Sequence, residues 1–200
     1  MALQTHSPLI TAPTRHRITV AEFERMIAAN VWLEDEHLEL IEGELIAMSP
    51  LNAPHAHAVQ VLLYIFIRRL QQQALVWAQN PMRLEDGSRP EPEVMLLRYR
   101  ADFYRDRLPT PPDVLLVIEV SDTTLDYDRE TKSRIYARAG IPELWIMDLN
   151  GERLIVFRSP ENGEYTRIES LRSGATLAPL ALPDLVLSVD EILGTSQVGE

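Results

Sequence analysis

Apolar residues recur along the chain with two different periods, and their alternation predicts a mixture of helices and strands. The clearest helical pattern lies in residues 55–73, where the apolar positions fall on one face of a helix. A capping box formed by Thr19 and Glu22 predicts a shorter helix over residues 20–29. Two further helices are expected over residues 126–139 and 189–193.

Short segments with the strand pattern separate these helices. From Leu38 the segment LELIEGELIAMS reads as a hairpin, with Gly43 supplying the positive φ that such a turn needs. The run VLLVIEV is apolar and β-branched, as expected of a buried central strand, and only Glu119 interrupts it. Further strands are expected over residues 75–84, 93–97, 143–148, 153–158 and 165–169. The predicted fold class is therefore α/β (α+β mixed), a central mixed sheet flanked by helices.

The bulk composition favours one domain. A chain of 200 residues with 46% hydrophobic content buries one core well, so we expect a single domain over residues 18–195 behind a loose arm at residues 1–17. The longest apolar run, residues 61–67, is far shorter than the roughly 20 residues that cross a bilayer. The absence of cysteine excludes disulfides and thiolate metal sites and fits a reducing compartment. We therefore expect a soluble cytoplasmic protein with no membrane partner.

The formal net charge of -11 argues against binding nucleic acid over the whole surface, because affinity for a polyanion comes largely from Lys and Arg. The charge is compatible with nucleic-acid binding if part of it lies in a metal site, where a cation neutralises it, and if basic residues cluster locally.

Glu119 is the most informative residue, because a carboxylate in an apolar strand is costly unless it is paired or bound to a cation. In the segment RPEPEV, Glu93 opens another apolar strand and can reach the same end of the sheet. Two such carboxylates form a hard oxygen site suited to Mg²⁺. The alternatives are a salt bridge from Glu119 to a helical Arg or Lys, and a solvated Glu93.

Lys132 is expected on the buried side of the helix that follows, because Ile135, Tyr136 and Ala139 stand three, four and seven positions further on. Near a metal site its ammonium would orient the attacking water and offset charge developing on a phosphate. The alternative is an exposed lysine that balances Asp128 at the i,i+4 spacing.

Three motifs follow one another in a distinctive order. They are LELIEGELIAMSP with His55 five residues past Pro50, then RPEPEV, then PPDVLLVIEVSDTTLDYDRETKSRIYARAGIPELWIMD. In these motifs the chain resembles the Uma-type restriction endonuclease family, a branch of the PD-(D/E)XK nuclease superfamily, over about residues 20–165. The resemblance implies a restriction-endonuclease-like fold and a DNA endonuclease that uses Mg²⁺, for which Mn²⁺ can substitute.

Carried over position by position, the resemblance also implies the site. Glu93 and Glu119 would be the metal ligands, with the backbone carbonyl of Val120 as a further ligand. Glu39 matches the family's additional N-terminal acid, and Lys132 would serve as a motif lysine that has moved to the helix. The expected catalytic residues are thus Glu39, Glu93, Glu119 and Lys132.

Three positions depart from the pattern. Ser121 stands where E-x-K places the lysine, which is why that lysine must come from the helix. Glu93 replaces the family's usual Asp, and its extra methylene moves the carboxylate outward. Asp122 replaces the usual Pro and adds an acid near the expected scissile phosphate.

Three further residues are candidates for substrate binding. His55 stands at the start of the long helix, and because a helix N-terminus favours anions it is a candidate for contacting phosphate. The alternative is that it caps the helix or packs beside Val59. Tyr127 and Arg129 are candidates for positioning phosphates, although arginines on an amphipathic helix often form its solvated face.

The sequence leaves three classes of function open. The first is the Mg²⁺-dependent endonuclease, with DNA as its partner. The second is a catalytically weakened or inactive nuclease fold that acts as a nucleic-acid or protein binding module. The third, a two-carboxylate glycosidase, leaves Lys132 unexplained. A homodimer is expected, because the stretch 177–187 is more apolar than one small sheet must bury.

Overall fold

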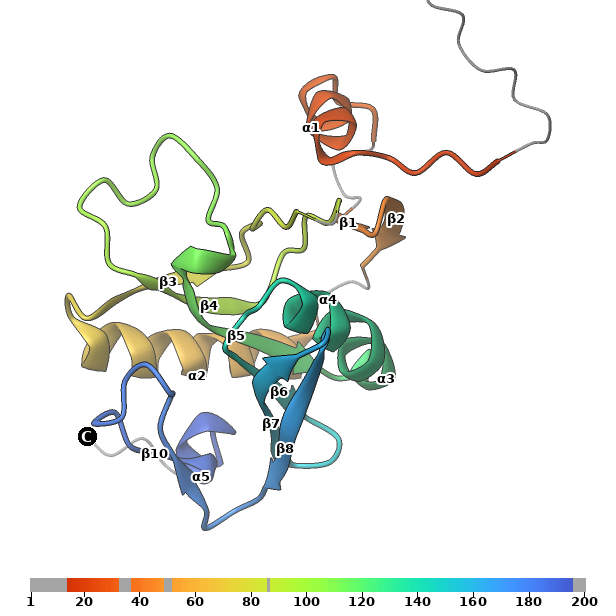
Figure 1. Cartoon of the computed structure of the whole chain (residues 1–200). Helices are drawn as coiled ribbons and strands as arrows, with labels where there is room; N and C mark the ends of the chain where they lie inside the picture. Colours follow the sequence, from red (N-terminus) through yellow and green to blue (C-terminus); the bar gives the residue numbers. More distant parts are fainter. Residues whose placement is uncertain (1–13, 33–36, 49–51, 86, 196–200) are drawn as a thin grey trace, which may run out of the picture.

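The computed structural model describes residues 14–32, 37–48, 52–85 and 87–195, so most of the arm expected at residues 1–17 lies outside the described residues. At its centre is a six-stranded sheet with the order β3-β4-β5-β6-β7-β8 (Figure 1). These strands are β3 (Ala74–Ala78), β4 (Val94–Arg98), β5 (Val114–Ser121), β6 (Glu143–Asp148), β7 (Arg153–Glu161) and β8 (Glu164–Leu171). Strands β5 and β6 are parallel and all other neighbours are antiparallel, which confirms the mixed sheet.

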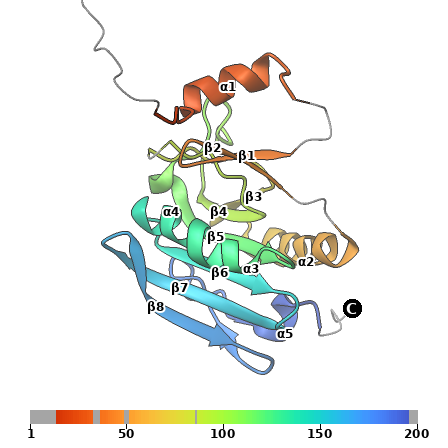
Figure 2. The same ribbon diagram turned by 90° about the vertical axis from the view of Figure 1, so that its right-hand side faces the viewer.

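Helices cover both faces of this sheet (Figure 2). The long helix α2 (Ala53–Leu70) packs on β3, β4 and β5, and α5 (Val189–Ile192) lies beside it. The helix that follows β5 packs on the opposite face, against β7 and β8, through α4 (Ser133–Arg138). No helix in the described part of the chain is long and apolar enough to span a bilayer.

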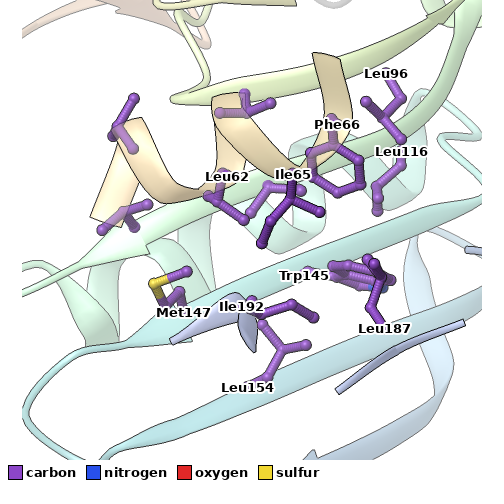
Figure 3. Packing of buried hydrophobic residues seen from close by; sticks show 14 of the residues in the cluster. Leu62, Ile65, Phe66, Leu96, Leu116, Trp145, Met147, Leu154, Leu187 and Ile192 are labelled. Carbon is purple, nitrogen blue, oxygen red and sulfur yellow. The ribbon is translucent and has the colours of Figure 1, made fainter. Parts of the chain in front are cut away.

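The alternating pleat of the strands divides the core into two layers. Val94, Leu96, Leu116 and Ile118 pack with buried residues of α2 in one layer. Figure 3 shows part of this layer, in which Leu62, Ile65 and Phe66 of α2 lie near Leu96, Leu116 and Trp145. The strand residues that alternate with these point to the opposite face of the sheet, where they pack with Ile135, Tyr136 and Ala137 in the other layer. Because both faces of β5 are covered, all eight of its residues are buried.

A separate N-terminal unit contains α1 (Val20–Ala28) and the hairpin of β1 (Leu38–Ile41) and β2 (Glu44–Ala47). The predicted capping box at Thr19 and the predicted positive φ of Gly43, +79°, are both present. A Cβ at Gly43 would lie 2.7 Å from the Cβ of Arg17, so glycine is also needed for the close approach of that segment. A bridge from Leu40 to Arg89 ties the hairpin to the chain that leads into β4.

Three local expectations differ from the structure. The expected strand 75–84 ends at Ala78, and the chain to Glu93 is largely irregular because prolines cannot donate to a ladder. The expected helix 126–139 consists of α3 (Leu125–Tyr127), a π-helical turn (Asp128–Lys132) and α4. The structure also contains elements that were not predicted, namely β9 (Thr176–Leu177), β10 (Leu187–Ser188) and the 3-10 turn η1 (Pro111–Asp113).

Candidate active site

Three charged side chains from three separate elements meet in the interior. Glu119 projects from β5, Glu39 from β1 and Lys132 from the π-helical turn, and each is at most 2% exposed. The Nζ atom of Lys132 lies 3.1 Å from Oε1 of Glu39 and 3.2 Å from Oε1 of Glu119. We call these three residues, together with Tyr136, the buried cluster. The burial of Lys132 excludes the exposed lysine that the sequence left open.

Two further hydrogen bonds hold the carboxylates of the buried cluster. The hydroxyl of Tyr136 on α4 donates to Oε1 of Glu119 at 2.6 Å. The backbone N–H of Glu91 donates to Oε1 of Glu39 at 2.8 Å. Since both donors point at oxygens that also contact Lys132, the geometry of the ion pairs is fixed from several sides.

The helix that carries Lys132 is shaped locally by its π-helical turn, a conformation that is rare and often found at functional sites. Asp128, at the start of this turn, is buried and accepts hydrogen bonds from the hydroxyls of Ser121 and Thr124, each at 2.7 Å. Ser121 is the last residue of β5, so Asp128 anchors the turn directly to the end of the strand that carries Glu119.

Glu93 has its own partners at the start of β4. Its Oε1 lies 3.0 Å from Nε2 of His55, and its Oε2 accepts a hydrogen bond from Gln79 at 3.1 Å. His55 lies in the first turn of α2, whose N-terminus is capped by the side chain of Asn52. The hydrogen bond to Glu93 raises the pKa of His55, against burial, and the backbone of Val120 contributes in the same direction.

The strand register relates Glu93 to Glu119. In the antiparallel pair of β4 and β5, Val94 is the partner of Ile118, and one further step of this register sets Glu93 opposite Glu119. Glu93 therefore contacts His55 at the end of the sheet where Glu119 meets Lys132. The site is thus divided between an acid–imidazole pair and the buried cluster.

The electrostatics of the buried cluster follow from its burial. Burial raises the pKa of Glu119, while the Lys132 ammonium opposes this shift. Burial alone would lower the pKa of Lys132, but the charges on Glu119 and Glu39 outweigh it and raise that pKa. Two carboxylates thus share one ammonium, which leaves the cluster with excess negative charge when both acids are ionised.

Oxygen donors of the kind that Mg²⁺ prefers are present at this end of the sheet, namely the carboxylates of Glu93 and Glu119 and the carbonyl of Val120. Among the described residues, Oε2 of Glu39 is buried without a hydrogen-bond partner. Within the described residues, no three His, Asp or Glu side chains form a group that could hold a metal ion. Mg²⁺ commonly takes only one or two carboxylates and fills its remaining positions with water and phosphate oxygens.

The remaining candidate residues lie around this centre. Tyr127 is half-buried, its hydroxyl has no hydrogen-bond partner among the residues that the structure describes, and burial with the charge on Glu39 raises its pKa to about 12. Arg129 is exposed on the same helical segment. Asp122 accepts hydrogen bonds from Asn52 at 2.5 Å and from Asn150 at 3.0 Å, so it joins the end of β5 to the start of α2.

The residue spacing does not predict the roles of two residues, Tyr136 in the buried cluster and Asp128 outside it. Tyr136 stands at a helical position that reads as core, and nothing in the spacing indicates that its hydroxyl reaches Glu119. Asp128 was considered only as a partner of Lys132, whereas its hydrogen-bond partners are Ser121 and Thr124. The serine and threonine hydroxyls just upstream of Asp128 were the available signal.

The sheet, its covering helices and the acids at the end of β5 define a protein of the restriction-endonuclease-like class. The model of the Uma2 family, described as "Putative restriction endonuclease", matches residues 20–190, and the chain belongs to this family. A solved structure described as a "putative nuclease belonging to DUF820" from Anabaena variabilis ATCC 29413 is similar in fold, with a TM-score of 0.68 at 15% identity. The match covers 88% of this chain and 98% of that one. No curated protein matches the sequence significantly. Family and fold together support nuclease activity.

Proposed function

We propose that the protein is a Mg²⁺-dependent endonuclease that hydrolyses phosphodiester bonds of DNA. The observation that carries this proposal is the buried cluster at the end of β5, where Lys132 bridges Glu39 and Glu119. Keeping two carboxylates and an ammonium away from water is costly, and such arrangements are concentrated at functional sites. The family and the fold supply the reaction class.

In this proposal Glu93, Glu119 and the Val120 carbonyl would hold the Mg²⁺ ion, for which Mn²⁺ can substitute. When bound, the cation polarises the phosphate and lowers the pKa of a water molecule. Burial raises the pKa of Glu119 to about 8, although the Lys132 ammonium opposes this rise, so Glu119 would have to give up its proton to serve as a ligand. Tyr136 fixes the orientation of the same carboxylate through its hydrogen bond.

Lys132 has a second proposed task. An ammonium has three N–H donors; that of Lys132 donates one hydrogen bond to Glu39 and forms an ion pair with Glu119. A remaining N–H is assigned to the attacking water, whose oxygen forms the new bond to phosphorus as the P–O bond on the opposite side breaks; the proton that the water loses passes to solvent, and the leaving oxygen takes up a proton from solvent. His55, Tyr127 and Arg129 are assigned to the phosphate groups that flank the bond being cut.

The test compares nicking of supercoiled plasmid DNA by the wild type and by Glu119→Gln in Mg²⁺ and in Mn²⁺. Loss of the charge should abolish metal binding and nicking together, while the shape of the side chain is kept. Glu169→Gln is the matched control, because Glu169 is exposed on β8. Nicking by Glu119→Gln at the wild-type rate would refute the assignment of Glu119.

A binding module is the second candidate function, favoured by one observation. Glu93, which stands where the family has Asp, is engaged by His55 and Gln79. If the wild type binds metal and DNA but nicks no DNA in any divalent cation, the binding module replaces the endonuclease.

We also propose a homodimer for this function, since two copies would cut two strands. In the C-terminal stretch, Leu182 and Leu187 are buried in the core, whereas Leu180 and Val186 are exposed. These two exposed side chains are the proposed dimer contact. Light scattering should give twice the chain mass for the wild type and a smaller mass for Val186→Asp. A monomeric mass for the wild type at every concentration would contradict the dimer.

A further inference from the structure

The connection between β4 and β5 is a long loop that projects beyond the sheet, drawn in light green in Figure 1. Its first part, residues 99–107, has the sequence YRADFYRDR, in which aromatic residues alternate with arginines and aspartates. We call this part the aromatic loop. It lies outside the buried cluster, and the proposed mechanism does not use it.

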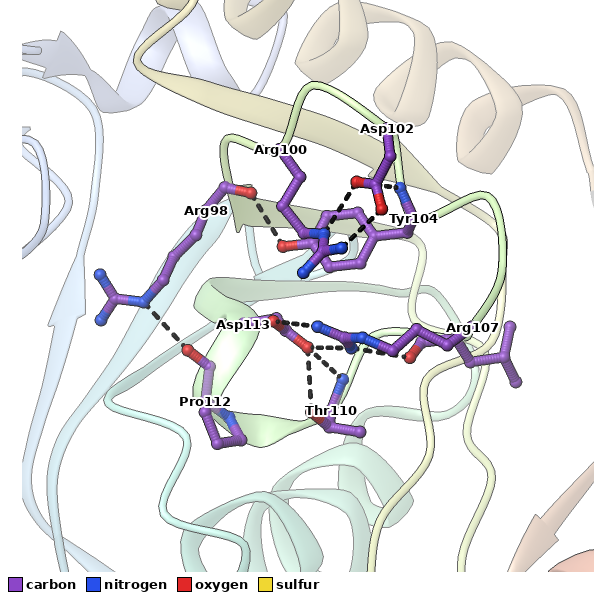
Figure 4. A network of polar contacts seen from close by, with 9 residues as sticks. Arg98, Arg100, Asp102, Tyr104, Arg107, Thr110, Pro112 and Asp113 are labelled. Carbon is purple, nitrogen blue, oxygen red and sulfur yellow. Dashed lines mark hydrogen bonds and ion pairs between the residues drawn. The ribbon is translucent and has the colours of Figure 1, made fainter.

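A network of polar contacts holds the aromatic loop in shape (Figure 4). Arg100 forms two hydrogen bonds with Asp102, at 2.9 and 2.5 Å. Arg107 forms two with Asp113, at 2.6 and 2.9 Å, and this ties the end of the loop to the turn before β5. The buried Tyr104 donates its hydroxyl to the carbonyl of Arg98 at 2.8 Å and lies beneath the guanidinium groups of Arg100 and Arg107.

This framework presents two aromatic rings to solvent. Phe103 is 60% exposed and Tyr99 is 40% exposed, and their ring centroids lie 6.4 Å apart in an edge-to-face arrangement. Phe103 and Tyr104 both have positive φ, +52° and +56°, a conformation that bulky residues rarely adopt. One consequence is that Tyr104 points into the core while Phe103, its neighbour, faces water. Two exposed rings held by a rigid framework are better suited to a ligand than to the core.

The charges around the rings indicate the chemistry of that ligand. Residues 98–113 contain four arginines and three aspartates, a net charge of +1 in a chain whose net charge is -11, so this segment is less acidic than the chain as a whole. Asp102 and Asp113 are engaged by Arg100 and Arg107. The exposed Arg105 stands two positions from Phe103. Exposed rings with adjacent arginines match the surfaces that stack unpaired bases and contact their phosphates.

We infer that the aromatic loop binds a single-stranded segment of the nucleic-acid substrate, with bases stacked on Phe103 and Tyr99 and a phosphate on Arg105. This inference rests on the proposed endonuclease function and specifies the substrate as one with an unpaired strand some distance from the cut, because the loop and Glu93 lie at opposite ends of β4 (Val94–Arg98). Along β4 the loop lies about 20 Å from Glu93, at about 3.3 Å per residue. That distance corresponds to about six stacked nucleotides at about 3.4 Å each.

The test measures binding of a fluorescein-labelled 20-nucleotide oligothymidylate by anisotropy, at low salt and without divalent metal so that no cleavage occurs. Phe103→Ala should weaken binding on the order of tenfold, as expected for the loss of one stacked base. The same variant should bind an abasic oligonucleotide of equal length as the wild type does, because there are no bases to stack. Arg105→Ala should weaken binding of both oligonucleotides, because it contacts phosphate.

Ile168→Ala and Arg167→Ala are the matched controls, since both residues are exposed on β8 at the other edge of the sheet, and neither should change binding. Equal affinity of the wild type and Phe103→Ala for oligothymidylate would overturn the inference while leaving the endonuclease proposal intact. The inference would also be overturned if the wild type bound duplex DNA more tightly than oligothymidylate and Phe103→Ala did not change the affinity for either. A wild type that binds neither oligonucleotide nor duplex, with or without metal, would refute the proposed function itself. A change in light-scattering mass on Phe103→Ala without a change in binding would overturn the inference in favour of self-association.

Discussion

The buried cluster and the aromatic loop both depend on ion pairs between acids and bases, but their environments differ. Lys132, Glu39 and Glu119 are at most 2% exposed, and one ammonium serves two carboxylates. In the loop, Arg107 and Asp113 form a one-to-one pair, and the side chain of Arg107 is 41% exposed. Water therefore solvates the loop pair, whereas the cluster depends on its own members for stabilisation.

This difference separates the two regions by function. An exposed pair with matched charges organises a surface at little cost, which suits a loop that presents rings to a ligand. Burial raises the pKa of Glu119 to about 8, so the cluster has excess negative charge only when this carboxyl is ionised, and a cation or hydrogen bonds must then compensate the charge. The cluster is consequently the part of the molecule whose properties should respond most to metal ions and to single substitutions.

The largest expected effect comes from removing the shared ammonium. Lys132→Met keeps the aliphatic stem but leaves two buried carboxylates without their counter-ion, which should reduce the free energy of unfolding by about 3–5 kcal/mol. Arg107→Met removes the corresponding cation of the loop and should cost at most about 1 kcal/mol. Urea denaturation of both variants gives the comparison. Equal losses would show that burial does not distinguish the two regions.

Divalent metal should stabilise the cluster and leave the loop unaffected. Binding to the native state alone stabilises the fold by about 2.7 kcal/mol when the free metal concentration is 100 times its Kd. Mg²⁺ or Mn²⁺ should therefore raise the melting temperature of the wild type and of Arg107→Met equally, but not that of Glu119→Gln. An unchanged wild-type melting temperature at millimolar metal would mean that Glu93 and Glu119 do not share a cation.

The buried cluster and the aromatic loop each contain a buried tyrosine, so the same substitution, tyrosine to phenylalanine, can be compared in both. The hydroxyl of Tyr136 donates to the carboxylate of Glu119, and that of Tyr104 donates to the neutral carbonyl of Arg98. Tyr136→Phe should cost about 1.5–3 kcal/mol and Tyr104→Phe about 0.5–1.5 kcal/mol, because hydrogen bonds to charged groups contribute more. Thermal unfolding of the two variants at neutral pH measures the difference. A larger loss for Tyr104→Phe would contradict the assignment.

The smallest expected effect is the loss of stability at acidic pH that comes from protonation of Asp113, the partner of Arg107. Hydrogen bonds from Arg107, and then from Thr110, hold the pKa of Asp113 well below its usual value, against burial. A lowered pKa in the folded state stabilises the protein above the unfolded pKa of about 3.9, and this stabilisation is lost as the pH falls below that value. Asp113→Asn should therefore be less stable than the wild type by at most about 1 kcal/mol at neutral pH. The urea midpoints of the wild type and Asp113→Asn should therefore approach each other at strongly acidic pH. A difference as large there as at neutral pH would contradict this role of Asp113.

Much of the fold could be predicted from periodicity alone. The apolar face of α2, the unbroken apolar run of β5 and the turn at Gly43 are local signals, and each produced the expected element. Helical spacing placed Lys132 on the buried side of its helix but left an exposed lysine open, and the structure shows it buried. In these places local pattern and tertiary packing agree, so the sequence carries the information directly.

Other features depend on contacts between distant segments, which periodicity does not encode. The pairing of Glu93 with His55 requires the irregular chain before β4 to bring two elements together. The π-helical turn depends on Asp128 being drawn to the end of β5, and a helical pattern of apolar residues does not reveal it. The positive φ of Phe103 and Tyr104 likewise depends on the polar network of the loop rather than on glycine.

The proposed function gives Lys132 a role in cleavage and Glu119 a role in holding the metal. The most direct test measures Mn²⁺ binding by calorimetry and plasmid nicking on the same preparations of wild type and Lys132→Met, with folding verified by circular dichroism. The account predicts that Lys132→Met still binds Mn²⁺ but nicks slower by a factor on the order of 100 or more, as for the loss of one electrostatic donor. If Lys132→Met is folded, binds Mn²⁺ and nicks DNA as fast as the wild type, the account is contradicted.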